Sequence, residues 1–185
     1  MTADPARGER IYITGFMGSG KSTVGPILAN TIGYDFADLD RTIEDEEGTP
    51  VSAIFRVRGE EFFRNLEREQ INKLSKRSHI VVSLGGGTLV DPACLELVVA
   101  TGILVYLKLP QELLFKRLWN RRGRPLLSDA EGNRLPETEL RERIHTLSQA
   151  REPLYARADI TIEPDEHRVG ITIDRLVRGL APFVK

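Results

Sequence analysis

The chain has 185 residues, of which 41% are hydrophobic and 29% are charged, and its formal net charge is −1. This composition is typical of one globular domain, and without an overall basic field the chain is not expected to bind nucleic acid. No apolar run approaches the ~20 residues that a membrane-spanning helix needs, so we expect no membrane partner. The one cysteine, Cys94, has no internal disulfide partner, which favours a cytoplasmic location without excluding export.

Strands and helices are predicted to alternate after a polar tail over residues 1–9 that we expect to be disordered. The predicted strands cover residues 11–14, 34–40, 79–84, 103–107 and 160–162. The predicted helices cover residues 23–32, 42–47, the segment from Pro50 to a break at Gly59, 60–76, 93–100, 111–120, 137–156 and 169–183. This order predicts one three-layer α/β domain over residues 10–185, with a central five-stranded parallel sheet flanked by helices.

Residues 121–136 show no helical or strand period and are rich in Arg, Gly, Asp and Pro, so we expect a mobile lid loop there. Arg121, Arg122 and Arg124 lie near its start. A loop that closes over ATP and brings an arginine to the transferring phosphate would have this composition.

A phosphate-binding loop is the most specific motif of the chain. Residues 15–22 match G-x-x-x-x-G-K-[ST], and they follow a predicted strand and precede a predicted helix. The glycines let successive backbone N–H groups form an anion nest at the helix N-terminus. Lys21 can reach the β- and γ-phosphates, and the Ser22 hydroxyl can bind Mg²⁺. The alternative is a glycine-rich turn that matches by chance, but the flanking elements favour a site for ATP with Mg²⁺.

The carboxyl ends of the predicted strands should gather the remaining site residues, because ligands bind at that edge of a parallel sheet. The second predicted strand ends in Asp38 and Asp40, whereas the third ends at Leu84 and is followed by Gly85, Gly86 and Gly87. We expect Asp38 to face the metal and Asp40 to orient a hydroxyl nucleophile and accept its proton. The alternatives are solvated, helix-capping acids for the pair and a plain turn for the glycines.

Arg64 and Arg151 each lie near an aromatic residue and could hold an acidic substrate through a bidentate fork. For each arginine taken alone, the sequence favours the alternative, a partner in a surface salt bridge.

Six motifs in this order resemble the shikimate kinases over residues 10–185. They are GFMGSGKST at 15–23, DLD at 38–40, FR at 63–64 with Glu67, SLGGG at 83–87, RPLL at 124–127 and REPLY at 151–155. The resemblance implies ATP-dependent phosphorylation of the 3-hydroxyl of shikimate, on the path to chorismate and the aromatic amino acids. It also implies a cytoplasmic enzyme, which we expect to be a monomer.

The resemblance also implies a role for particular residues. The catalytic residues would be Lys21, Asp40 and Arg124. The nucleotide would be held by Gly18, Ser19, Gly20, Lys21, Ser22, Thr23, Arg117, Arg124 and Arg168, and the metal by Ser22 and Asp38. Shikimate would contact Asp40, Arg64, Gly85, Gly86, Gly87 and Arg151. The substrate-binding region would cover about residues 38–67, and the lid would cover about residues 121–136.

Two other functions remain open at this point. One is a kinase for another small hydroxylated acid such as gluconate, or for a nucleoside monophosphate, on the same scaffold. The other is a non-catalytic ATP-binding module, although Lys21, Ser22 and both acids are retained. A GTPase is disfavoured, because the segment Asn72-Lys73-Leu74-Ser75 lacks the acid of a guanine-reading N-K-x-D motif.

Overall fold

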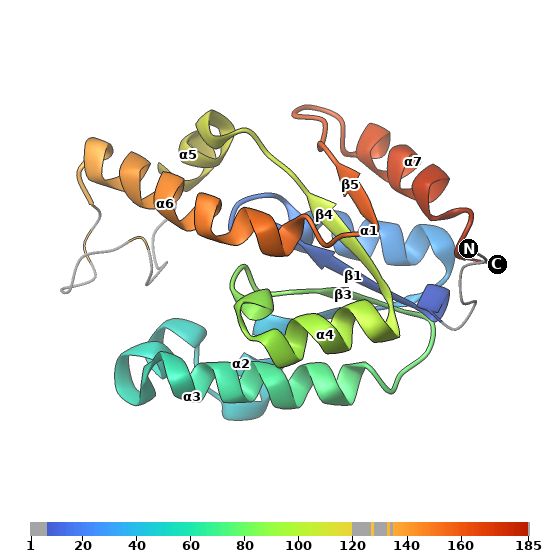
Figure 1. Cartoon of the computed structure of the whole chain (residues 1–185), viewed down its shortest axis with the longest axis horizontal. Coiled ribbons are helices and arrows are strands. Elements are labelled where there is room, and N and C mark those ends of the chain that lie inside the picture. The colour runs from blue at the N-terminus through green and yellow to red at the C-terminus, as the bar shows by residue number, and fades with distance from the viewer. Residues whose placement is uncertain (1–6, 120–126, 128–132, 134, 185) are drawn as a thin grey trace.

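The computed structural model describes residues 7–119, 127, 133 and 135–184. Its centre is a sheet of five parallel strands in the order β2-β3-β1-β4-β5 (Figure 1). The strands are β1 (Arg10–Thr14), β2 (Asp35–Asp38), β3 (Ile80–Ser83), β4 (Ile103–Leu107) and β5 (Ile160–Ile162). The predicted fold class and the place of each strand are confirmed, with ends that differ by up to two residues.

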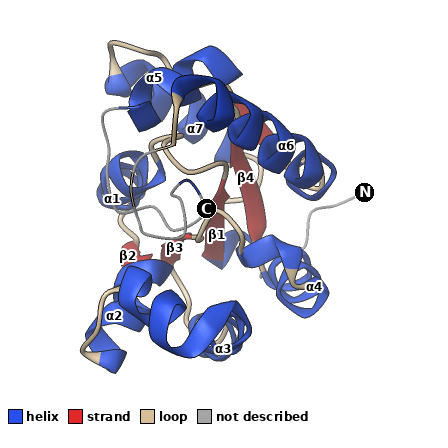
Figure 2. Cartoon of the chain, turned by 90° about the vertical axis from the view of Figure 1, so that its left-hand side faces the viewer, coloured by secondary structure: helices blue, strands red, loops and turns tan. Residues whose placement is uncertain are grey.

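Seven α-helices and two short 3-10 helices are described around this sheet. The α-helices are α1 (Lys21–Ile32), α2 (Leu39–Glu47), α3 (Val51–Leu74), α4 (Pro92–Thr101), α5 (Gln111–Trp119), α6 (Glu137–Tyr155) and α7 (Val169–Leu180). The 3-10 helices are η1 (Arg7–Glu9) and η2 (Thr88–Val90). Figure 2 shows the strands between α1 on one side and α4 on the other.

The central strand β1 explains why helices cover both faces of the sheet. Ile11 and Ile13 belong to a buried cluster that includes residues of α1 and α7, whereas Tyr12 belongs to a second cluster with residues of α2, α3 and α4. All three side chains are fully buried. A parallel strand that is apolar on both faces needs a layer of helices on each.

The start of α2 corrects one boundary that matters for the site. The sequence predicted a strand through Asp40, but β2 ends at Asp38, and Asp40 lies in the first turn of α2. Asp38 is the N-cap of α2, and its Oδ1 accepts a hydrogen bond from the backbone N–H of Arg41 at 3.3 Å. Aspartate favours this position because its side chain satisfies a backbone donor that the helix leaves unpaired.

The two helices predicted on either side of Gly59 form one kinked element, α3. Gly59 has φ 84° and ψ 170°, which are not helical angles, and the chain resumes its helical path at Glu60. The predicted break is therefore present as a kink. This kink sets the direction of the second half of α3, which carries Arg64 and Glu67.

Residues 7–9, which fall within the expected tail over residues 1–9, form the short helix η1. Arg7 donates hydrogen bonds to the carbonyl of Gly102 at 2.8 Å and to Asp159 at 2.9 Å. At the other predicted mobile segment, residues 120–126, 128–132 and 134 lie outside the described residues. Leu127 and Leu135 are buried in a third apolar cluster with residues of α5 and α6.

Candidate active site

The phosphate loop joins β1 to α1 and lines a cavity of about 450 Å³. Lys21 Nζ lies in this loop and donates hydrogen bonds to the carbonyls of Gly15 at 2.7 Å and Phe16 at 3.3 Å. Arg117 on α5 donates from Nη1 to the carbonyl of Gly18 at 3.2 Å, so a second cation lies against the same loop. Both cations also line the cavity, which suits a polyphosphate.

Ser19 gives a further indication that the loop is built for a polar ligand. Its Oγ is fully buried and makes no hydrogen bond within the part of the chain that the structure describes. A buried hydroxyl without a partner is unfavourable by about 1–3 kcal/mol, and a phosphate oxygen in the cavity would relieve it.

Ser22 and Asp38 form a pair that suits a magnesium ion. Ser22 Oγ donates a hydrogen bond to Asp38 Oδ2 at 2.9 Å, and both residues line the large cavity. A hydroxyl and a carboxylate are hard oxygen ligands, and Mg²⁺ typically takes one or two such groups together with waters and substrate phosphates. The donor set present therefore fits the expected metal.

A smaller cavity of about 70 Å³ adjoins the large one. The two cavities share Met17, Asp40 and Gly86, so Asp40 stands where they meet. The rest of the smaller cavity is lined by Val51, Phe55, Phe63, Arg64, Glu67, Gly85, Gly87 and Arg151. A carboxylate between a phosphate-binding cavity and a second cavity can orient an acceptor hydroxyl toward a transferable phosphate.

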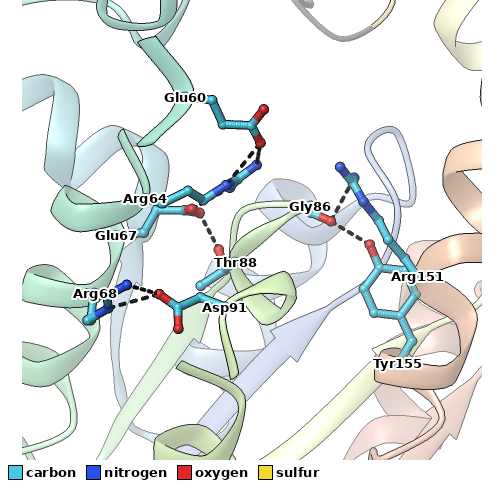
Figure 3. A network of polar contacts seen from close by, with 9 residues as sticks. All are labelled: Glu60, Arg64, Glu67, Arg68, Gly86, Thr88, Asp91, Arg151 and Tyr155. Atoms are coloured by element: carbon cyan, nitrogen blue, oxygen red, sulfur yellow. Dashed lines mark hydrogen bonds and ion pairs between the residues drawn. The ribbon is translucent and has the colours of Figure 1, made fainter. Parts of the chain in front are cut away.

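Arg64 on α3 is held by two carboxylates of its own helix (Figure 3). Its Nη1 donates to Glu67, and its Nε and Nη2 donate to Glu60 Oε1 at 3.2 and 2.7 Å. Burial alone would lower the pKa of the Arg64 guanidinium, but Glu67 and Glu60 outweigh it and raise that pKa. Arg64 is therefore a permanent cation in the smaller cavity.

Glu67 is the most deeply buried acid of this network, with 1% of its surface exposed. It accepts hydrogen bonds from Arg64 and from the Thr88 hydroxyl at the start of η2. Burial raises the pKa of Glu67, and the nearby Asp40 adds to this, against the opposing effects of Arg64 and Thr88. Within the described part of the chain, these two contacts offset the cost of burying Glu67, so Glu67 fixes one side of Arg64 firmly.

Arg151 lines the smaller cavity from α6, on the side opposite Arg64, and Tyr155 of the same helix contacts Gly86 beside it (Figure 3). Arg151 Nη1 and the Tyr155 hydroxyl both donate to the carbonyl of Gly86, at 2.9 and 2.6 Å. Burial raises the pKa of Tyr155 to about 12, so its hydroxyl remains a donor at neutral pH. Arg64 and Arg151 thus bring two cations from different helices to one small cavity, which suits a carboxylate.

Most of the residues singled out from the sequence come together here. The large cavity is lined by Gly18, Ser19, Gly20, Lys21, Ser22, Thr23, Asp38, Asp40, Gly86 and Arg117, and the smaller one adds Arg64, Gly85, Gly87 and Arg151. Arg124 lies outside the described residues. Arg168 does not line the large cavity, and its backbone N–H donates to Asp165 Oδ1 at 2.7 Å.

Sequence reasoning missed part of the large cavity. Residues 164–167, between β5 and α7, line it together with Val169 and Thr172. The segment Pro164-Asp165 is a turn signal directly after a strand, and Asp165 accepts hydrogen bonds from the backbone N–H groups of His167 and Arg168. Such a turn at the carboxyl end of a fifth parallel strand could have been included on topological grounds.

The chain is similar to known proteins over most of its length. The family model for shikimate kinase matches residues 17–180. A shikimate kinase from Chlorobium limicola is 46% identical over 175 residues, which cover 95% of this chain and 88% of that protein. The solved structure of shikimate kinase from Acinetobacter baumannii in complex with shikimate has a TM-score of 0.85 at 33% identity and covers 96% of each chain.

A gluconokinase from Sinorhizobium meliloti has a TM-score of 0.55 at 22% identity, covering 95% of this chain and 93% of that one. At that identity the likeness shows a shared fold and does not bear on the substrate. The family match over most of the chain and the relatives above 40% identity are decisive. The chain belongs to the shikimate kinase family.

Proposed function

We propose that this chain transfers the γ-phosphoryl group of ATP to the 3-hydroxyl of shikimate, giving ADP and shikimate 3-phosphate on the path to aromatic amino acids. The observation that carries the proposal is that a phosphate-binding cavity and a small cavity with two arginines meet at Asp40. The related protein from Acinetobacter baumannii was solved with shikimate, which supports the same acceptor for this chain.

In this proposal the smaller cavity orients the acceptor. Arg64 and Arg151 bind the carboxylate of shikimate, and Gly85, Gly86 and Gly87 allow the ring to approach the backbone. The other end of the ring, with its hydroxyls, then faces Asp40 and the large cavity. Holding both substrates in this way converts their encounter into a step within one complex.

The transfer step is an in-line displacement at the γ-phosphorus. Asp40 holds the 3-hydroxyl and takes its proton as the new oxygen–phosphorus bond forms, while the bond to the β,γ-bridging oxygen breaks and ADP leaves. Lys21 stabilises the developing negative charge, and the sequence motif at Arg124 assigns that residue the same task. Ser22 and Asp38 would hold Mg²⁺, which would neutralise negative charge on the phosphate oxygens.

The proposal keeps residues 10–185 as one kinase domain, with a substrate-binding region over about 38–67 and a lid over 121–136. We also propose that the protein is cytoplasmic and monomeric.

Within the described ranges no helix is both long and apolar enough to span a membrane. Size-exclusion chromatography with light scattering tests the oligomeric state.

The test of function is shikimate-dependent release of ADP, measured in a coupled assay with and without Mg²⁺. We expect turnover only when shikimate, ATP and Mg²⁺ are all present. Phosphorylation of gluconate or a nucleoside monophosphate, without any of shikimate, would assign the chain another acceptor. ATP binding with no turnover of any acceptor would instead favour a non-catalytic module.

A further inference from the structure

The single positive charge of Arg64 is paired with two carboxylates, those of Glu60 and Glu67. Glu67 occupies its Nη1, and Glu60 Oε1 spans its Nε and Nη2 at 3.2 and 2.7 Å. Two carboxylates therefore share one guanidinium before any substrate carboxylate is counted. Figure 3 shows Glu60 and Glu67 on different sides of the Arg64 side chain.

The two carboxylates differ in how readily they can leave. Glu67 is 1% exposed and is also bonded to Thr88, so separating it from Arg64 would leave a buried charge without its cation. The side chain of Glu60 is 55% exposed, and it can turn into water at little cost. Of the two, Glu60 is the one that a ligand can replace.

Glu60 engages a nitrogen of Arg64 that lies beside the smaller cavity. A β-carbon on Gly87, which lines the smaller cavity, would stand 2.7 Å from Arg64 Nη2 and 3.0 Å from Nη1. Both terminal nitrogens therefore lie beside the cavity, and each already donates one of its two N–H groups to a carboxylate, so an incoming carboxylate meets a guanidinium whose charge is shared by two acids. Nη2 is 2.7 Å from Glu60 Oε1.

We infer that Glu60 is an internal stand-in for the carboxylate of the substrate, and that shikimate must displace it from Arg64 in order to bind. This inference rests on the proposed function. Glu60 keeps Arg64 oriented and neutralised beforehand, and the cost of displacing it is subtracted from the affinity for shikimate. Glu60 is thus a residue that sets the affinity for the acceptor without contacting the reacting atoms.

The local geometry explains why Glu60 is held there. Gly59, with φ 84° and ψ 170°, kinks α3, and Glu60 is the first residue after the kink. From that position it lies four residues before Arg64, the spacing at which oppositely charged side chains meet on one face of a helix. The neighbouring Glu61 is also exposed, and within the described part of the chain it forms no ion pair with Arg64.

The test compares Glu60→Gln and Glu60→Ala with Glu61→Gln as the control, which removes the same charge one residue away. For both Glu60 variants we expect the KM for shikimate to fall about two- to fivefold, the range that a partly exposed ion pair supports. The KM for ATP should not change. Titration calorimetry of shikimate without nucleotide should show the same gain in affinity, and Glu61→Gln should behave as the wild type.

Three outcomes would overturn the inference. Glu60 variants with the same shikimate affinity as Glu61→Gln would show that no displacement occurs. Weaker binding in the Glu60 variants would show that Glu60 only supports Arg64. If the wild-type protein neither binds nor phosphorylates shikimate, the proposed function fails and the inference fails with it. The first two results leave the proposed function intact, because the wild type still turns over shikimate.

Discussion

Asp40 and Glu67 approach the backbone of Gly85 from two different helices. A β-carbon on Gly85 would stand 2.8 Å from Asp40 Oδ1 and 2.7 Å from Glu67 Oε1, and 2.9 Å from Thr88 Oγ1. Asp40, which we propose to orient the acceptor, and Glu67, which bonds to Arg64, are therefore kept close together by the absence of one side chain. Gly85 thus makes room for these neighbouring groups of the protein itself.

Alanine at Gly85 and at Gly87 should have different consequences. At Gly85 the new methyl group would meet oxygens of three residues, two of which are buried, so Gly85→Ala should lower both stability and kcat. At Gly87 the three nearest atoms all belong to the guanidinium of Arg64, which is the end of a long side chain. Gly87→Ala should therefore raise the KM for shikimate about tenfold, with a smaller loss of stability than Gly85→Ala.

The measurements for this pair are thermal unfolding and steady-state kinetics with shikimate varied. Gly179→Ala is the control. Gly179 lies in α7, and a methyl group there would make ordinary van der Waals contact with Ile160 of β5 at 3.4 Å. The control should keep wild-type kinetics. Equal effects of Gly85→Ala and Gly87→Ala on stability and KM would contradict the prediction that the first disturbs buried acids and the second disturbs Arg64.

The phosphate loop, the parallel sheet and the acid pair could be predicted from the sequence, because local patterns specify them. A strand followed by G-x-x-x-x-G-K-[ST] leaves the backbone little choice, and apolar runs on a parallel strand require helices on both faces. The boundary at Asp38 was wrong because a period-two pattern does not show where a capping aspartate ends the strand.

The contacts of the arginines could not be predicted in the same way. Arg64 forms the salt bridges that one interpretation of the sequence expected, and it also lines the smaller cavity, where its binding of an acidic substrate stays a prediction. Which acids it pairs with depends on the kink at Gly59 and on Thr88, which is 21 residues from Glu67 along the chain. The bond between Tyr155 and Gly86 spans 69 residues, and no local pattern encodes it.

Asp40→Asn should separate binding of ATP from turnover. The amide keeps the size of the side chain but cannot accept the proton of the acceptor hydroxyl, so kcat should fall by about 10²–10⁴-fold. Because the phosphate loop is unchanged, ATP affinity measured by titration should stay within about twofold of the wild type. Near-normal turnover in this variant would remove Asp40 from the proton-transfer step.

Arg64→Ala should weaken the binding of shikimate, and it should also lower stability because the buried Glu67 loses its cation. The lost charge-assisted hydrogen bonds contribute about 1.5–3 kcal/mol, which corresponds to a rise in KM of roughly 10- to 100-fold. Arg68→Ala is a matched control, since Arg68 lies four residues later on α3 and pairs with Asp91 rather than lining the cavity. An unchanged KM in Arg64→Ala, or an equal rise in Arg68→Ala, would contradict the carboxylate-binding role.

The tyrosines should make the protein less stable in alkaline solution. Each of the four has a raised pKa: burial is the largest cause for all of them, and it brings the pKa of Tyr155 to about 12. A raised phenol pKa means that above about pH 10 the unfolded chain binds fewer protons than the native one. The stabilisation is complete below pH 10 and is lost as the pH rises through the native pKa.

Tyr155→Phe tests this prediction, with Tyr34→Phe as the less buried control. At neutral pH Tyr155→Phe loses its hydrogen bond to Gly86, and the free energy of unfolding should fall by about 1 kcal/mol. Between pH 10 and 12, however, the free energy of unfolding of Tyr155→Phe should fall less steeply than that of the wild type. The difference between the two slopes should reach up to about 1.4 kcal/mol per pH unit. Urea unfolding at several pH values measures both effects. Parallel curves for wild type and Tyr155→Phe would show that the Tyr155 hydroxyl titrates normally, against the burial that the structure gives it.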